Sequence, residues 1–217
     1  MISSLQAHTL ALGEGGEFSD GLSNGADYLN AMLKIHHREK LLNAIIYFAA
    51  HTRGCGKTKL FKLLYLLDFE HFKATGRSVT GQDYYAWELG PVPVRLNEEL
   101  DEPSGDVFQA VRIEPEQVMN YQRLNVVPQR SFDPSHFSNR ELRLLESIAA
   151  SYAYANATDM VDVTHAENGA WDKVWRDGEG QNQLISYDLA LEGVPDRARI
   201  EQAATDYSET LKRMGAA

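Results

Sequence analysis

The sequence predicts a mainly α fold of the α+β class, a compact helical domain with a small antiparallel β-sheet or hairpin. Apolar residues recur at three- and four-residue spacing over residues 27–50 and 58–74, which is the pattern of helices with buried faces. A complete helix start, the capping box SNRE, stands at residues 138–141. Two short runs rich in β-branched residues, VFQAVRI at 107–113 and YQRLNVV at 121–127, predict the two strands.

The composition is that of one domain. A chain of 217 residues with 43% hydrophobic residues can bury a substantial core. Residues 1–25 are rich in Gly and Ser and show little periodicity, so they are predicted to form a loose N-terminal arm, and residues 26–217 a single domain. The net charge of −10 argues against a general nucleic-acid binder and favours encounter with a basic partner. The basic cluster KIHHREK at 34–40 is too small a basis for a DNA-binding interpretation.

The chain shows no sequence feature that would take it to or across a membrane. No apolar run is long enough to span a bilayer, and the N-terminus lacks the basic and apolar regions of a signal peptide. The single cysteine, Cys55, forbids an internal disulfide and fits a reducing compartment. We therefore expect a cytoplasmic location and no membrane partner.

The first predicted helix covers about residues 27–50, and its pattern leaves open a break near His36 and His37. The segment after it, HTRGCGKTKLF at 51–61, contains GKT, which matches the end of the phosphate-binding loop pattern G-x-x-x-x-G-K-[ST]. That pattern needs a glycine where His51 stands and a strand before the loop, whereas a helix precedes it. The interpretation we favour is a junction between two helices, with Thr58 as the N-cap of the second.

The second predicted helix, residues 58–74, is apolar almost all round and ends at Gly76, which makes it central to the domain. Its polar stripe is interpreted as solvated, as is the lysine just before the helix; the residues concerned are Lys57, Lys59, Lys62, Glu70 and Lys73. Asp68 is the exception, because helical spacing places it on an apolar face. A buried carboxylate needs hydrogen bonds or an ion pair. The favoured interpretation is an Asp that ties the helix to a neighbouring loop; the alternative is a catalytic or ligand-binding acid.

The rest of the chain alternates turns with short elements. Glycines mark turns at 76, 81 and 90, residues 84–87 have an extended pattern, and GPVP at 90–93 forms a rigid corner before a short helix at 94–100. The third major helix follows the capping box, and its predicted core face consists of Leu142, Leu145, Ile148 and Tyr152. A final helix is expected from about Pro195 to Met214, with residues 215–217 as a short tail.

Candidate chemistry is sparse, and no catalytic, cofactor-binding or metal-binding residues are predicted. The sharpest candidate is the stretch ATDMVDVTHAENGAWDKVW at 157–175, where Asp159, Asp162 and His165 recur at three-residue spacing. They could converge on a metal or act in acid–base chemistry, since histidine titrates near neutrality. The alternative is a locally hydrogen-bonded histidine followed by a loop held by Trp171 and Trp175, and the lack of a matching motif favours it.

The segment KTKLFKLLYLLDFEHFKATGRSVTGQDYYAWELGPVPVRLNEEL resembles the signature of the Panacea domain of SocA-like antitoxins. The shared pattern is a K-L-x-K-L-L-Y-x-x-D-F helix, then T-G-R-x-x-T-G, then a D-Y-x-A-W-x-x-G-P-V-P corner. The later FSNRELRLLESI and the H-x-x-x-x-x-W element from His165 to Trp171 match in order, so the resemblance covers roughly residues 37–176. The chain departs from the pattern at ENGAW, where the family often has Pro before the Trp.

The resemblance implies a mostly α domain with a small sheet that neutralises, by direct binding, a protein toxin encoded by a neighbouring gene. In one branch of the family it also implies an adaptor that delivers the toxin to the ClpXP protease. It names no enzyme activity and no cofactor. The signature positions, which form the fold or bind the partner, are Lys62, Leu63, Leu64, Tyr65, Asp68, Phe69, Gly76, Tyr84, Trp87, Gly90, Pro91, Val92, Pro93, His165 and Trp171.

Two other function classes remain as alternatives to an antitoxin. One is an enzyme that uses Asp68 or the Asp162/His165 pair on a small ligand. The other is a DNA-binding autorepressor, which the acidic charge and the lack of a clear helix-turn-helix disfavour.

Overall fold

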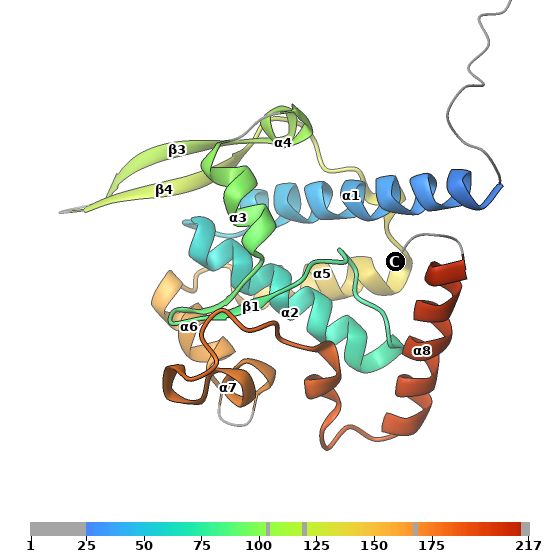
Figure 1. Cartoon of the computed structure of the whole chain (residues 1–217). Helices are drawn as coiled ribbons and strands as arrows, with labels where there is room; N and C mark the ends of the chain where they lie inside the picture. The colour runs from blue at the N-terminus through green and yellow to red at the C-terminus, as the bar shows by residue number, and fades with distance from the viewer. Residues whose placement is uncertain (1–24, 103–104, 119–120, 167–168, 214–217) are drawn as a thin grey trace, which may run out of the picture.

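The computed structural model describes residues 25–102, 105–118, 121–166 and 169–213, and the architecture below refers to them. All but the last residue of the predicted N-terminal arm, and the predicted tail at 215–217, lie outside these residues. The fold is mainly α with small antiparallel sheets, as predicted (Figure 1). The α-helices are α1 (Gly25–His51), α2 (Lys57–Thr75), α3 (Val94–Asp101), α4 (Gly105–Ala110), α5 (Asn139–Ser151), α6 (Ala157–Thr164), α7 (Ala170–Trp175) and α8 (Arg197–Arg213). Short 3-10 turns are η1 (Pro134–His136), η2 (Arg176–Gly178) and η3 (Tyr187–Leu191).

The strands form two separate antiparallel pairs. β1 (Tyr85–Trp87) pairs with β2 (Gly90–Val92), and Ala86 lies opposite Pro91. β3 (Val111–Val118) pairs with β4 (Tyr121–Pro128) in a ribbon that projects from the helical body in Figure 1. The predicted strand 107–113 is wrong in its first half, since 107–110 belongs to α4. Val107 and Ala110 are both buried, and their three-residue spacing puts them on one face of a helix but on opposite faces of a strand.

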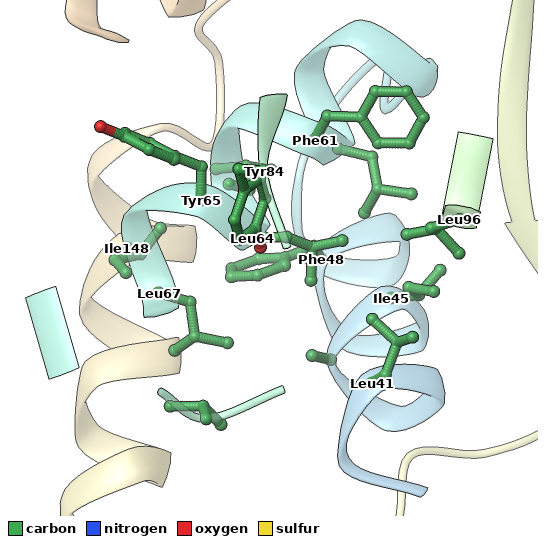
Figure 2. Packing of buried hydrophobic residues seen from close by; sticks show 14 of the residues in the cluster. Leu41, Ile45, Phe48, Phe61, Leu64, Tyr65, Leu67, Tyr84, Leu96 and Ile148 are labelled. Atoms are coloured by element: carbon green, nitrogen blue, oxygen red, sulfur yellow. The ribbon is translucent and has the colours of Figure 1, made fainter. Parts of the chain in front are cut away.

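The central helix is α2, which packs between α1 on one side and α5 and α6 on the other (Figures 1 and 2). Its leucines and aromatic residues meet the apolar face of α1, which is buried from Leu41 onward. α1 continues through His36 and His37, so the break left open there does not occur. Packing on nearly every side explains why α2 is apolar almost all round.

The ends of α2 are set by two glycines. Gly76 ends the helix with φ of 70°, and its N–H donates to the Phe72 carbonyl at 2.8 Å, as expected of a glycine C-cap. α8 passes so close that a Cβ at Gly76 would lie 2.7 Å from the Ile200 carbonyl oxygen. At the other end the N-cap is Gly56, without a side-chain hydrogen bond, so the prediction of Thr58 as N-cap is wrong. The helix begins earlier because Gly56 already has extended backbone angles and its carbonyl accepts from Leu60.

α5 begins with the predicted capping box. The Ser138 hydroxyl accepts from the Glu141 N–H at 3.3 Å, and the Glu141 carboxylate accepts from the Ser138 N–H at 2.7 Å. Leu145 and Ile148 are buried beneath it, and the other two residues of the predicted core face pack at the edge of the core. α8 agrees with the predicted final helix within a few residues. None of the described helices combines the length and the apolar composition that crossing a membrane requires.

Candidate functional site

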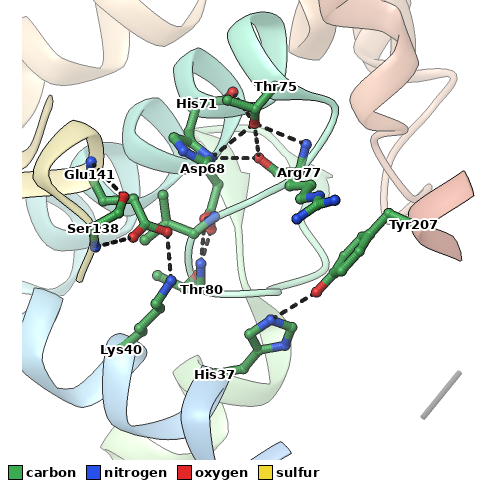
Figure 3. A network of polar contacts seen from close by, with 11 residues as sticks. His37, Lys40, Asp68, His71, Thr75, Arg77, Thr80, Ser138, Glu141 and Tyr207 are labelled. Carbon is green, nitrogen blue, oxygen red and sulfur yellow. Dashed lines mark hydrogen bonds and ion pairs between the residues drawn. The ribbon is translucent and has the colours of Figure 1, made fainter. Parts of the chain in front are cut away.

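Asp68 lies in a buried hydrogen-bond network between α2 and the loop that follows it (Figure 3). The backbone N–H groups of Val79 and Thr80 each donate to Oδ1 at 2.7 Å. The Thr80 hydroxyl and, at 2.8 Å, the Tyr84 hydroxyl donate to Oδ2. Burial raises the pKa of the Asp68 carboxyl, while these hydrogen bonds act in the opposite direction. The prediction that Asp68 ties the helix to a neighbouring loop is confirmed.

A second polar contact in the same region joins α1 to α5 (Figure 3). Lys40 Nζ lies 2.6 Å from Glu141 Oε1, and both side chains are largely buried. Burial opposes the charge of Glu141, but the hydrogen bonds from Lys40 and Ser138 outweigh it, so the pKa of Glu141 lies below its usual value. Glu141 therefore both caps α5 and anchors α1 on it.

Lys62 is buried, with 1% of its surface exposed, and its interpretation as a solvated residue is wrong. Its Nζ donates to the Pro91 carbonyl at 3.0 Å, which fastens β2 to α2. Gly90 leaves the room for this contact, because a Cβ there would lie 2.9 Å from both Lys62 Nζ and Thr164 Oγ1. Burial lowers the pKa of Lys62 to about 7.

This buried amine predicts a stability that rises with pH just above neutrality. The unfolded chain holds the Lys62 proton up to about pH 10, whereas the folded chain releases it near pH 7, so unfolding takes up a proton in between. From pH 7 to 8.5 we expect the free energy of unfolding to rise by about 1.5 kcal/mol. Higher pH is avoided because burial raises the pKa of Cys55 to about 11, which acts in the opposite direction. Urea titrations of the wild type and Lys62→Met measure the rise; an equal rise in both would contradict the assignment.

His165 lies directly against Trp171, with the two rings parallel and their centroids 3.6 Å apart. Its Nε2 is buried without a hydrogen-bond partner among the described residues. Burial lowers the pKa of His165, and the nearby charge of Lys62 lowers it further. The result is a neutral ring packed flat on Trp171, which favours the interpretation of a loop held by that tryptophan; the local hydrogen bond that this interpretation included is not seen among the described residues.

Trp171 connects this stack to the β1–β2 hairpin. Its Nε1 donates to the Trp87 carbonyl at 3.1 Å. The Tyr65 ring packs edge-on against Tyr84, at a centroid distance of 5.5 Å, and Phe69 lies beside both. Tyr84 in turn donates to Asp68.

The signature positions therefore form one connected network that holds the hairpin and α7 on α2. Pro91 and Val92 lie in β2, and Pro93 precedes α3 as its N-cap. Most of these side chains are buried, and Trp87, with 36% of its surface exposed, is the signature side chain most open to solvent. Only the exposed part of such a network can contact another protein without unfolding.

The residues Asp159, Asp162 and His165 do not form a common site. Asp159 accepts from the Asn156 N–H at 2.8 Å as part of the capping box of α6, and Asp162 is exposed. His165 stacks on Trp171. Across the described residues, no group of three or more His, Cys, Asp or Glu side chains could hold a metal ion. The arrangement thus gives no support to a metal or acid–base centre here.

Lys59 is the buried polar residue that the sequence interpretation missed most completely. It has no exposed surface, and its Nζ donates to the carbonyls of Arg53 at 3.0 Å and Ala155 at 2.7 Å, with that of Ala153 at 3.4 Å. Lys57, two residues earlier, is 18% exposed and so is only partly solvated: its Nζ lies 2.6 Å from the exposed Asp101 and donates to the Asn97 carbonyl at 3.3 Å. Thus GKT is a helix start, and one of its neighbouring lysines holds two loops together.

A comparison with family models identifies the group to which this network belongs. The model described as "Antitoxin SocA-like, Panacea domain" matches residues 60–172. The chain belongs to this family. The Panacea domain match covers every signature position from Lys62 to Trp171, and it confirms the resemblance seen in the sequence. No curated protein and no solved structure matched the chain.

Within the described Panacea domain, three polar side chains of the network join elements to one another: Asp68 holds a loop, Lys62 a strand and Trp171 a hairpin. The family description is antitoxin-like, which implies a protein partner in general.

Proposed function

We propose that this chain is an antitoxin that neutralises a cognate protein toxin, encoded by a neighbouring gene, by direct binding. The observation that carries the proposal is the Panacea-domain match over residues 60–172. The net charge of −10 supports it, because an acidic antitoxin is steered toward a basic partner and kept from nucleic acid. The single, buried cysteine fits a cytoplasmic pair of proteins.

The enzyme alternative receives little support from the geometry. Asp68 is 0% exposed and its two oxygens already accept four hydrogen bonds, so a substrate would have to displace them. Asp162 and His165 are separated in role, one exposed and the other stacked on Trp171. A binding protein needs no such centre.

The test is co-expression with the product of the neighbouring reading frame, each under its own promoter. We expect the frame's product to arrest growth alone and the antitoxin to restore it, and we expect the two purified proteins to elute together. Arrest that continues although this chain accumulates in folded form would contradict the proposal. An empty vector and an unrelated acidic protein serve as controls.

Toxin levels in the same cells separate two routes of neutralisation. Occlusion predicts restored growth with an unchanged amount of toxin. Delivery by an adaptor predicts that the toxin disappears, and only in cells that contain ClpXP. Direct binding underlies both routes, so the elution experiment applies to either.

A further inference from the structure

Apolar side chains gather at the β1–β2 hairpin in a group that we call the β1 face: Tyr85 and Trp87 on β1, Leu89 in the hairpin turn, and Leu184 on the segment that pairs with β1. β1 lies between β2 and the segment at 183–185, where the Ala86 N–H donates to Gln183 and the Ile185 N–H to Tyr84. In Figure 1 the chain after α7 runs beside β1. Tyr85 is paired with Leu184, and Trp87 is two residues further along β1, so the three side chains share one face.

Three of these side chains are open to solvent although they are large, and Tyr85 is half-buried. Leu89 is 61% exposed, Leu184 53% and Trp87 36%. Single exposed apolar residues are normal, but several on one face mark a surface that contacts another molecule. Aromatic residues at the centre of such a surface are the ones that contribute most to binding.

A cavity of about 560 Å³ opens beside the β1 face, and it is both aromatic and acidic. Tyr85 and Trp87 line it together with Asp83 and Glu98. Neither carboxylate forms an ion pair with a described residue, and the one arginine of the lining, Arg95, lies 3.4 Å from Glu99. Glu88, at the tip of the hairpin, is also exposed and forms no ion pair with a described residue. The cavity therefore has an excess of negative charge next to aromatic rings.

The turn beside the cavity has an uncommon backbone conformation. Asn182, which lines the cavity, has a positive φ angle of 62°, which side chains other than glycine adopt rarely. The Asn182 N–H donates to the Ala86 carbonyl at 2.8 Å and so holds the turn against β1. Backbone strain of this kind collects at sites that contact ligands.

We infer that the β1 face and its cavity bind a basic segment of the toxin, an inference that rests on the proposed function. An Arg or Lys side chain enters the cavity, where it meets the carboxylates of Asp83 and Glu98 and the face of an aromatic ring. Apolar neighbours of that side chain pack on Leu89 and Leu184. The occupant is basic because the cavity's carboxylates lack partners and the whole chain is acidic.

The experiment measures the affinity of the purified antitoxin for the product of the neighbouring reading frame by calorimetry. The test variants are Leu184→Arg and the double variant Asp83→Lys with Glu98→Lys. Matched controls on other surfaces are Leu124→Arg, where Leu124 is 51% exposed on β4, and Glu146→Lys on α5. The substituted side chains lie at the surface, so thermal unfolding should stay near that of the wild type.

We expect each test variant to bind at least tenfold more weakly and the controls to bind as the wild type does. We also expect the wild-type affinity to fall with added salt. Wild-type binding that the test variants retain, or that Leu124→Arg alone abolishes, overturns the inference and leaves the proposed function standing. A wild type that does not bind overturns both. Sedimentation of the antitoxin alone covers the remaining case: a dimer dissolved by Leu184→Arg would show that a second copy occupies the face.

Discussion

Replacing Asp68 with Ala is expected to lower the free energy of unfolding by about 3–5 kcal/mol, the range for removing one partner of a buried charged group. The substitution leaves two backbone N–H groups and two hydroxyls without their acceptor in a site closed to water. Each unsatisfied buried group is costly, and the loop at 77–82 loses its attachment to α2. Chemical denaturation at pH 7 measures the loss.

Two further variants separate the hydrogen bonds from the volume of the side chain. Asp68→Asn keeps the shape and one acceptor oxygen for Val79 and Thr80, so we expect it to lose roughly half as much. Tyr84→Phe removes a single donor and should cost about 1 kcal/mol in the wild type. In the Asp68→Ala background it should cost almost nothing, because its partner is already gone. A loss below about 1 kcal/mol for Asp68→Ala would show that the network does not hold the loop.

The location of Asp68 could be predicted from sequence because helical spacing is a geometric rule. A carboxylate in register with Phe61, Leu64 and Phe72 is buried if the helix is, and a buried carboxylate needs donors. The prediction also placed those donors in a neighbouring loop. Which loop residues supply the donors depends on tertiary packing, and nothing in the sequence around Val79 marks it as a donor to Asp68.

Helical spacing led to a wrong prediction for Lys59 and Lys62, because it grouped them with the exposed Glu70 on one solvent-exposed stripe of the helix. The failure comes from position along α2: Lys59 and Lys62, nearer its start, donate to carbonyls of neighbouring segments, whereas Glu70 and Lys73, nearer its end, form an exposed ion pair. A stripe assignment assumes one environment for the whole helix. Both lysines stand in the family pattern K-L-x-K-L-L-Y-x-x-D-F, but the pattern attaches no role to either of them.

The β1 face shows a second limit of sequence interpretation, which is the pairing of segments that lie far apart in the chain. Trp87 was predicted in an extended piece, which is confirmed by β1. Leu184, however, comes beside it from nearly a hundred residues further along the chain through backbone hydrogen bonds, and such pairing leaves no periodic trace. A short helix next to a strand was equally difficult to predict from the sequence. α4 occupies residues that were assigned to a strand as part of a run with β-branched residues.

Replacing Lys59 with Met is expected to lower the free energy of unfolding by about 3 kcal/mol. Met keeps the length and the apolar stem of the side chain, so the core keeps its packing. What it removes is the donor for the carbonyls of Arg53 and Ala155, which lie in the loops before α2 and before α6. Hydrogen bonds from a charged donor contribute about 1.5–3 kcal/mol each, and buried carbonyls left without a partner add to the cost. Hydrogen exchange should show both loops opening more often, because Lys59 is their shared attachment.

Lys57 provides the matched control for this prediction, since it is a lysine two residues away at the start of the same helix. Its amine pairs with Asp101, whose side chain is 62% exposed, and donates to the Asn97 carbonyl at a long 3.3 Å; ion pairs with an exposed partner contribute about 1 kcal/mol. Lys57→Met should therefore unfold within that margin of the wild type, with unchanged exchange in both loops. If Lys57→Met and Lys59→Met lost equal stability, the loss would reflect lysine removal at the helix start in general, and the attachment of the two loops through Lys59 would be disproved. Loss confined to Lys59→Met is the result that the buried geometry requires.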